Sequence, residues 1–181
     1  VSSHTVLAHI RRATQGEHSI LNTHPFQFGQ WVFAHNGNIK DFPRHRKNLE
    51  RHVSPHMRPF IMGETDSELI FMILLSRLHT HPGTAPQECR AEDMKRAVRE
   101  TVDILVREVG DYSLIDECGP TETYLTFILT DGRAMVGLQG GKRLYYSTHK
   151  RQCPERATCP NLAPSCEAPP DSSRQVNHLI L

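Results

Sequence analysis

Apolar positions along the chain follow two patterns, short runs and helical periods. The short runs are rich in β-branched and aromatic residues and are bounded by turn-forming residues, which is typical of buried strands. They predict strands over residues 4–10, 31–35, 123–129, 135–138, 144–147 and 176–181. The Asn36-Gly37 dipeptide is a strong turn signal, so we expect it to end the second of these strands.

Three helices are predicted in the middle of the chain, the second and third from apolar residues spaced three and four apart. They cover residues 41–52, 65–78 and 92–109. The first is basic, with Asp41 as its expected N-cap and Pro43 in its first turn. The second is capped by Thr65 or Asp66 and presents one apolar face, and the third ends at Gly110.

The order of these elements is strands, then helices, then strands again, which favours an α+β layered sandwich. The chain of 181 residues is expected to form one domain over residues 1–181. Residues 150–174 interrupt the last strands, and they are rich in Pro, Cys and Ser without any periodicity. We therefore interpret residues 150–174 as an irregular insertion within the domain.

Composition excludes two classes of partner. Twenty-one Lys and Arg oppose twenty Asp and Glu, for a net charge of +1, so no strong positive charge predicts a nucleic-acid partner. No apolar run reaches the roughly 18 residues of a membrane span, so no membrane partner is expected. Nothing marks the chain as secreted, and a cytoplasmic location with reduced thiols is the expectation.

Four polar segments lie at expected strand ends or helix starts, where functional sites are usually built. In the first, Arg11 is able to clamp a carboxylate, although a structural ion pair is its plainer interpretation when it is taken alone. In the second, His24 precedes a proline, and a backbone-bonded loop residue is its plainer interpretation.

The other two segments add an anion site and a carboxylate. Asn36 and Gly37 offer a side-chain amide and an unhindered backbone N–H, which together suit the oxyanion of a tetrahedral intermediate, or they form a plain hairpin turn. Asp66 either caps its helix or receives a substrate ammonium. A carboxylate clamp, an ammonium receiver and an oxyanion hole together fit glutamine or a γ-glutamyl compound, but this set of residues contains no nucleophile.

The same segments resemble the class II glutamine amidotransferases, which are N-terminal-nucleophile hydrolases. The family patterns His-x-Arg-x-Ala-Thr-x-Gly, Asn-x-His-Pro, His-Asn-Gly and Thr-Asp-Ser/Thr-Glu occur in order, beginning at His9, Asn22, His35 and Thr65. The resemblance covers roughly the first 70 residues and implies a four-layer αββα sandwich.

The resemblance also implies roles for these residues. Arg11, helped by Thr14, would bind the α-carboxylate of glutamine, and Asp66 its α-amino group. Asn36 and Gly37 would form the oxyanion hole. His24 would lie near the site without acting as a general base, because in this family the free α-amino group of the nucleophilic Cys is the base.

The sequence departs from the family pattern in two ways. Arg12 stands where sugar-phosphate-aminating members have Trp, which fits the stand-alone, amidohydrolase-like members better. The family nucleophile is an N-terminal Cys, whereas the chain begins at Val1 and its first cysteine is Cys89. We therefore expect a domain incomplete at both ends, and a chain that is inactive by itself.

The pattern fits glutamine and larger γ-glutamyl amides equally, and it leaves the ammonia acceptor and the oligomeric state open.

A last candidate is a metal site in the insertion. His149, Cys153, Cys159 and Cys166 are able to hold Zn²⁺, but without the tight Cys-x2-Cys spacing of strong zinc signatures, so a loop with reduced thiols is the favoured interpretation. No cofactor or metal is expected. A non-catalytic amino-acid-binding or regulatory module and a zinc-stabilised interaction protein remain as alternative functions.

Overall fold

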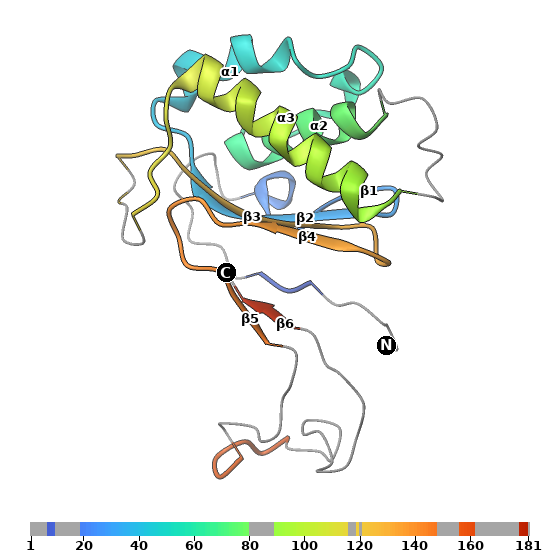
Figure 1. The fold of residues 1–181 in the computed structure, drawn as a ribbon, viewed down its shortest axis with the longest axis vertical. Coiled ribbons are helices and arrows are strands. Elements are labelled where there is room, and N and C mark those ends of the chain that lie inside the picture. The colour runs from blue at the N-terminus through green and yellow to red at the C-terminus, as the bar shows by residue number, and fades with distance from the viewer. Residues whose placement is uncertain are drawn as a thin grey trace. The chain divides into compact units, whose positions relative to one another are not determined.

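The structure is a computed structural model that describes residues 7–9, 19–79, 89–115, 119, 121–147, 156–161 and 178–180. These residues fall into two compact units, Val1–Arg143 and Leu144–Leu181. The first unit contains a four-stranded antiparallel sheet in the order β1-β2-β3-β4 and three α-helices (Figure 1). The strands of this sheet are β1 (Phe26–Phe28), β2 (Trp31–Asn38), β3 (Tyr124–Thr130) and β4 (Met135–Leu138). The helices are α1 (Phe42–Glu50), α2 (Asp66–His79) and α3 (Ala91–Val109), with short 3-10 turns at Ile20–Asn22 and Arg58–Phe60. An α+β fold is therefore confirmed.

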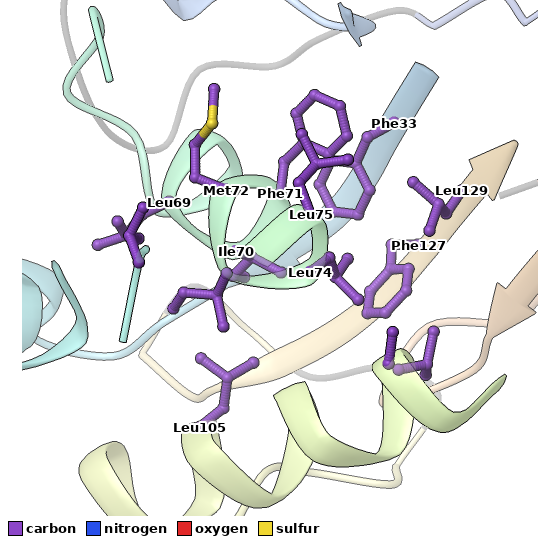
Figure 2. Packing of buried hydrophobic residues seen from close by; sticks show 14 of the residues in the cluster. Phe33, Leu69, Ile70, Phe71, Met72, Leu74, Leu75, Leu105, Phe127 and Leu129 are labelled. Atoms are coloured by element: carbon purple, nitrogen blue, oxygen red, sulfur yellow. The ribbon is translucent and has the colours of Figure 1, made fainter. Parts of the chain in front are cut away.

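The three helices lie on one face of the sheet (Figure 1), and α2 is the helix at the centre of the core. Figure 2 shows its apolar side chains packed between the strands and α3. The Phe33 ring of β2 stacks on Phe71 of α2 at 5.3 Å, and it also contacts Phe127 of β3 at 5.2 Å. Leu69 to Leu75 are all buried, so the prediction of a single apolar face on this helix is wrong. A helix that is apolar all round is one enclosed by other elements, which is how α2 lies here.

Strand β2 continues through the dipeptide that was expected to end it. Residues 32–38 all pair with β3, with Asn36 opposite Thr126 and Gly37 opposite Leu125. The turn prediction for Asn36-Gly37 is therefore wrong, and so is the hairpin-turn interpretation of these two residues. Pairing with a buried central strand outweighs the local turn preference of the dipeptide.

The helix ends confirm most of the sequence signals. Thr65 Oγ1 accepts a hydrogen bond from the Glu68 N–H at 3.2 Å, so Thr65 caps α2. Asp41 occupies the N-cap position of α1, but in a left-handed conformation and without a side-chain capping bond. Gly110 ends α3 with φ 89°, a value that favours glycine.

The remaining strand predictions have mixed outcomes. The strands predicted over residues 123–129 and 135–138 are confirmed as β3 and β4, which pair with each other. Strands also lie within the ranges 144–147 and 176–181, as β5 (Tyr145–Ser147) and β6 (His178–Ile180), which pair in the second unit. Strand β1 was not predicted, because its three residues are too few to show a period. Of the strand predicted over residues 4–10, the structure describes residues 7–9, which carry no regular element. In the described part of the chain, no helix is long and apolar enough to cross a membrane.

Candidate functional site

The end of β2 and the start of α2 bring together three of the predicted site residues. Asp66 Oδ2 accepts a hydrogen bond from the Ile39 N–H at 2.7 Å, and Ile39 directly follows β2. Asn36 and Gly37 lie two and three residues before Ile39 on the same strand. Residues 11 and 14, which carry the predicted Arg11 and Thr14, lie outside the described residues.

The backbone N–H of Gly37 points away from β3, toward the side of β2 on which β1 lies. The N–H of Leu125, which stands opposite Gly37, donates to Gly140 O on the far side of β3 at 2.6 Å. In an antiparallel ladder, Gly37 and Leu125 therefore form a non-hydrogen-bonded pair, and the Gly37 N–H points away from β3. On that side, β1 pairs with β2 only up to Phe33. Among the described residues, this N–H is thus left for another acceptor.

Asn36 lies on the face of the sheet opposite the helices. Side chains alternate along a strand, and Phe33 and its strand neighbour His35 face the helix side, so Asn36 faces the other way. Its side chain is partly buried and makes no hydrogen bond to any residue the structure describes. An amide donor beside a free backbone N–H is the arrangement that stabilises an oxyanion.

Asp66 is a buried carboxylate, 3% exposed, at the first residue of α2. In addition to the Ile39 N–H, it accepts hydrogen bonds at Oδ1 from the Ser67 N–H at 2.7 Å and the Ser67 hydroxyl at 3.3 Å. Among the described residues, no Lys or Arg pairs with it. A carboxylate has about four acceptor positions, so this buried anion retains capacity for a cationic donor.

His35 and Ser67 belong to the same cluster, and sequence reasoning gave them no role. His35 Nδ1 lies 3.0 Å from Ser67 Oγ, and both residues are buried. Since the Ser67 hydroxyl gives its proton to Asp66 Oδ1, Ser67 Oγ accepts from the Nδ1–H of neutral His35. Burial lowers the pKa of His35 below its ordinary value of 6.5 and outweighs the opposing effect of the Asp66 charge.

The ring of His35 also occupies the space beside Gly37. A Cβ placed on Gly37 would lie 1.7 Å from His35 Nε2 and 2.3 Å from Cε1. His35 and Gly37 are two positions apart on β2, so both lie on the side of the strand that faces the helices. The alternation His35-Asn36-Gly37 was the sequence signal for this contact, because it places a large ring beside a position without a side chain.

Hydrogen bonds join the loop before α2 to the Asn22 segment. Asn22 Oδ1 accepts from the Glu64 N–H at 2.9 Å, and the Glu68 carboxylate accepts from the backbone N–H groups of Met62 and Gly63, each at 2.8 Å. A Cβ on Gly63 would come within 2.6 Å of Asn22 Oδ1, so only glycine permits this approach. Two motif segments some 40 residues apart in the sequence are therefore held side by side.

His24 is buried next to the sheet, after the Asn22 segment. Its ring contacts the His9 ring at 4.5 Å and the Phe26 ring at 4.8 Å, and the peptide bond to Pro25 is cis. Its predicted place near the substrate stays a prediction.

No cysteine in the described part of the chain is placed as a nucleophile for this site. The pKa of Cys89 is raised to about 11 by burial and by the charges of Asp93 and Asp131, so the thiol is protonated at neutral pH. Asp131 follows β3 at the end remote from Leu125, about 20 Å along the strand. Cys159 lies in the second unit, while residues 149, 153 and 166 of the predicted zinc set lie outside the described residues. Among the residues described, no cluster of His, Cys, Asp or Glu is suited to a metal.

A profile of the class-II glutamine amidotransferases matches residues 1–158. The chain belongs to this family. A Saccharomyces cerevisiae relative of this amidotransferase domain, named "Probable glutamine amidotransferase DUG3", is 31% identical over 137 residues, which are 74% of the chain and 38% of that protein. A Haemophilus influenzae relative named for the same activity is 44% identical over 92 residues, 49% of the chain and 28% of that protein.

The amidotransferase chain thus spans less than two fifths of these relatives. A solved class-II glutamine aminotransferase domain protein from Silicibacter pomeroyi is 24% identical, with a TM-score of 0.49, and the match covers 72% of the chain and 55% of that structure.

Proposed function

We propose that this class-II domain binds glutamine or a γ-glutamyl amide and supports cleavage of the side-chain amide through a cysteine thioester. One observation carries the proposal. The Asn36 amide and the Gly37 N–H lie next to each other on β2, beyond the part of the strand that pairs with β1, and two residues from a backbone N–H that holds the Asp66 carboxylate. Family membership supports the same reaction.

In this proposal each group binds one part of the substrate. Asp66, a buried anion without a cationic partner in the described part of the chain, receives the α-ammonium. Arg11, helped by Thr14, binds the α-carboxylate, and His24 lines the site without a proton-transfer role. The substrate's side-chain carbonyl then lies at Asn36 and Gly37.

The chemistry is acyl transfer. A cysteine thiolate attacks the amide carbon, and the oxyanion of the tetrahedral intermediate accepts hydrogen bonds from the Asn36 amide and the Gly37 N–H. Ammonia or an amine leaves with the proton of the cysteine's own α-ammonium group, and water then hydrolyses the thioester to glutamate. The family resemblance implies an N-terminal cysteine as the nucleophile, and the half-buried Cys89, whose pKa is raised to about 11, is poorly suited to that role. We favour free hydrolysis over ammonia transfer, because Arg12 stands where sugar-phosphate-aminating members have Trp.

We further propose the four-layer αββα arrangement for this domain. Every residue of β3 is buried, although the helices cover only one face of the sheet. In the four-layer arrangement a second sheet would lie over the opposite face, on the side of Asn36.

Calorimetric titration tests the binding half of the proposal. The chain should bind L-glutamine, and it should lose affinity for N-acetyl-glutamine, which lacks the ammonium, and for glutamine methyl ester, which lacks the carboxylate. The full protein should convert glutamine to glutamate. Equal binding of all three compounds, or of none, contradicts the proposal, whereas selective binding without hydrolysis by the full protein supports the non-catalytic module.

A further inference from the structure

The contacts of His35 form a closed circuit between the two halves of the site. From the His35 ring beside Gly37, the circuit runs through Ser67 Oγ to Asp66, then from Asp66 Oδ2 to the Ile39 N–H. Strand β2 and its continuation join Ile39 back to Gly37. The oxyanion donors and the ammonium receiver are therefore tied to each other by side chains as well as by the strand.

We propose that His35 is a positioning residue, anchored by Ser67, that sets the place of the Asn36–Gly37 donors relative to Asp66; this inference rests on the proposed function. His35 is held from three directions. Ser67 Oγ anchors its Nδ1 at 3.0 Å, while the Phe33 and Phe127 rings flank it at 6.1 and 6.5 Å. A ring so confined limits how far Gly37 can shift toward the helices.

His35 does not act as the general base. Its side chain lies on the helix side of the sheet, whereas Asn36 faces the opposite side. Its hydrogen bond goes to Ser67, which is itself bound to Asp66. The proposal therefore predicts an effect on the geometry of the oxyanion donors and none on proton transfer.

Substitution of Ser67 tests the anchor. In the full protein, Ser67→Ala should lower kcat for glutamine hydrolysis by roughly 10- to 100-fold, because displacement of a catalytic group by a fraction of an ångström has effects of this order. KM should stay nearly constant, since Asp66 keeps its bonds from the Ile39 and Ser67 N–H groups. Ser67→Thr retains the hydroxyl and should restore kcat.

The control is Ser76→Ala on the same helix. The Ser76 hydroxyl is also buried, donates to Met72 O at 2.7 Å and accepts from the Ser54 N–H at 2.9 Å, but it has no contact with the circuit. Its replacement should lower stability and leave kcat unchanged.

Substitution of His35 itself tests for a role in proton transfer. His35→Asn should lower kcat without moving the pH profile of kcat. If His35→Asn instead removed the acid limb of that profile, His35 would be a general base and the proposal would be overturned.

A measurement without activity separates this proposal from the proposed function. In the 181-residue chain, the Gly37 amide resonance in a ¹⁵N–¹H spectrum should move in Ser67→Ala, return in Ser67→Thr and stay in place in Ser76→Ala. If the Gly37 resonance does not move in Ser67→Ala, the positioning role is overturned. A wild-type kcat in Ser67→Ala would overturn it as well. Absence of glutamine hydrolysis by the unmodified full protein overturns the proposed function instead, and the Gly37 resonance still decides the positioning role.

Discussion

The imidazole of His35 occupies the space in which a side chain on Gly37 would lie, since a Cβ there would stand 1.7 Å from His35 Nε2. Gly37 does not have a positive φ, so its backbone conformation does not require glycine. The three atoms nearest to such a Cβ all belong to the His35 ring, and this makes the requirement testable by paired substitutions.

Gly37→Ala should destabilise the folded chain by about 1–3 kcal/mol, the usual cost of overpacking a core. With His35→Ala in place, the same change should cost nothing, because the methyl group then enters vacated space. A double-mutant cycle of urea unfolding measures the difference. An equal cost of Gly37→Ala in both backgrounds would show that the two residues do not compete for this space.

Asp66→Asn should lower both the stability of the chain and its affinity for glutamine. The charged acceptor of the Ile39 and Ser67 N–H groups is lost, at about 1.5–3 kcal/mol for such a bond. Calorimetry should show at least a tenfold weaker binding of glutamine, and the preference over N-acetyl-glutamine should disappear.

Glu68→Gln is the matched control for Asp66. Glu68 is buried at the same end of α2 and also accepts two backbone N–H bonds, from Met62 and Gly63. Its replacement should lower stability and keep the preference for a free ammonium. If both variants lost the preference for a free ammonium, that preference would depend on the structure of the loop before α2 and not on the Asp66 carboxylate.

Acidification should destabilise the chain through His35. Burial lowers the pKa of His35 in the folded state, so below its ordinary value of 6.5 the unfolded chain binds a proton that the folded chain resists. The contribution to stability is fully present above pH 6.5 and is lost as the pH falls, by up to about 1.4 kcal/mol per pH unit. Urea unfolding at pH 7.5 and 5.5 gives the free energy of unfolding at each pH. The loss of this free energy between the two pH values should be smaller in His35→Asn than in the wild type.

His56→Asn is the control for this pH effect. His56 is an exposed residue outside the core that surrounds His35. Its replacement should leave the pH dependence of unfolding as it is in the wild type. A wild-type pH dependence in His35→Asn as well would remove His35 from the account of acid sensitivity.

Cys89→Ala should leave glutamine hydrolysis by the full protein unchanged. The pKa of its thiol is raised to about 11, so little thiolate is present at neutral pH and alkylation by iodoacetamide at pH 7.5 should be slow. Loss of hydrolysis in a folded Cys89→Ala variant would make this cysteine the nucleophile and reverse the assignment.

The sequence predicts the parts of the fold that depend on local pattern. The period of α3 and the apolar runs of β3 and β4 are strong enough to place these three elements within a residue or two. The Asn36-Gly37 turn fails because a partner strand nearly ninety residues away provides pairing that no local window contains. The same reason explains why His35 and Ser67 were missed, since their contact joins residues 32 apart in the sequence.

The site residues divide in the same way. Motif spacing predicts Asn36, Gly37 and Asp66 as a set, and the end of β2 and the start of α2 bring these residues together. The turn interpretation of Asn36-Gly37 would have hidden the property that matters most, the direction of the Gly37 N–H. That direction follows from the register of β2 against β3 and from the bond between Leu125 and Gly140, both of which are long-range facts.

The rate of glutamine hydrolysis by an Asn36→Ala variant of the full protein measures how much the oxyanion donors at the end of β2 contribute to catalysis. We predict that kcat falls by roughly 10²- to 10³-fold, the usual effect of removing one oxyanion donor, while KM stays close to that of the wild type. Asn36→Ala should also unfold at nearly the wild-type urea concentration, because its amide makes no hydrogen bond among the described residues. An unchanged kcat in a folded Asn36→Ala protein would contradict the claim that the end of β2 stabilises the transition state.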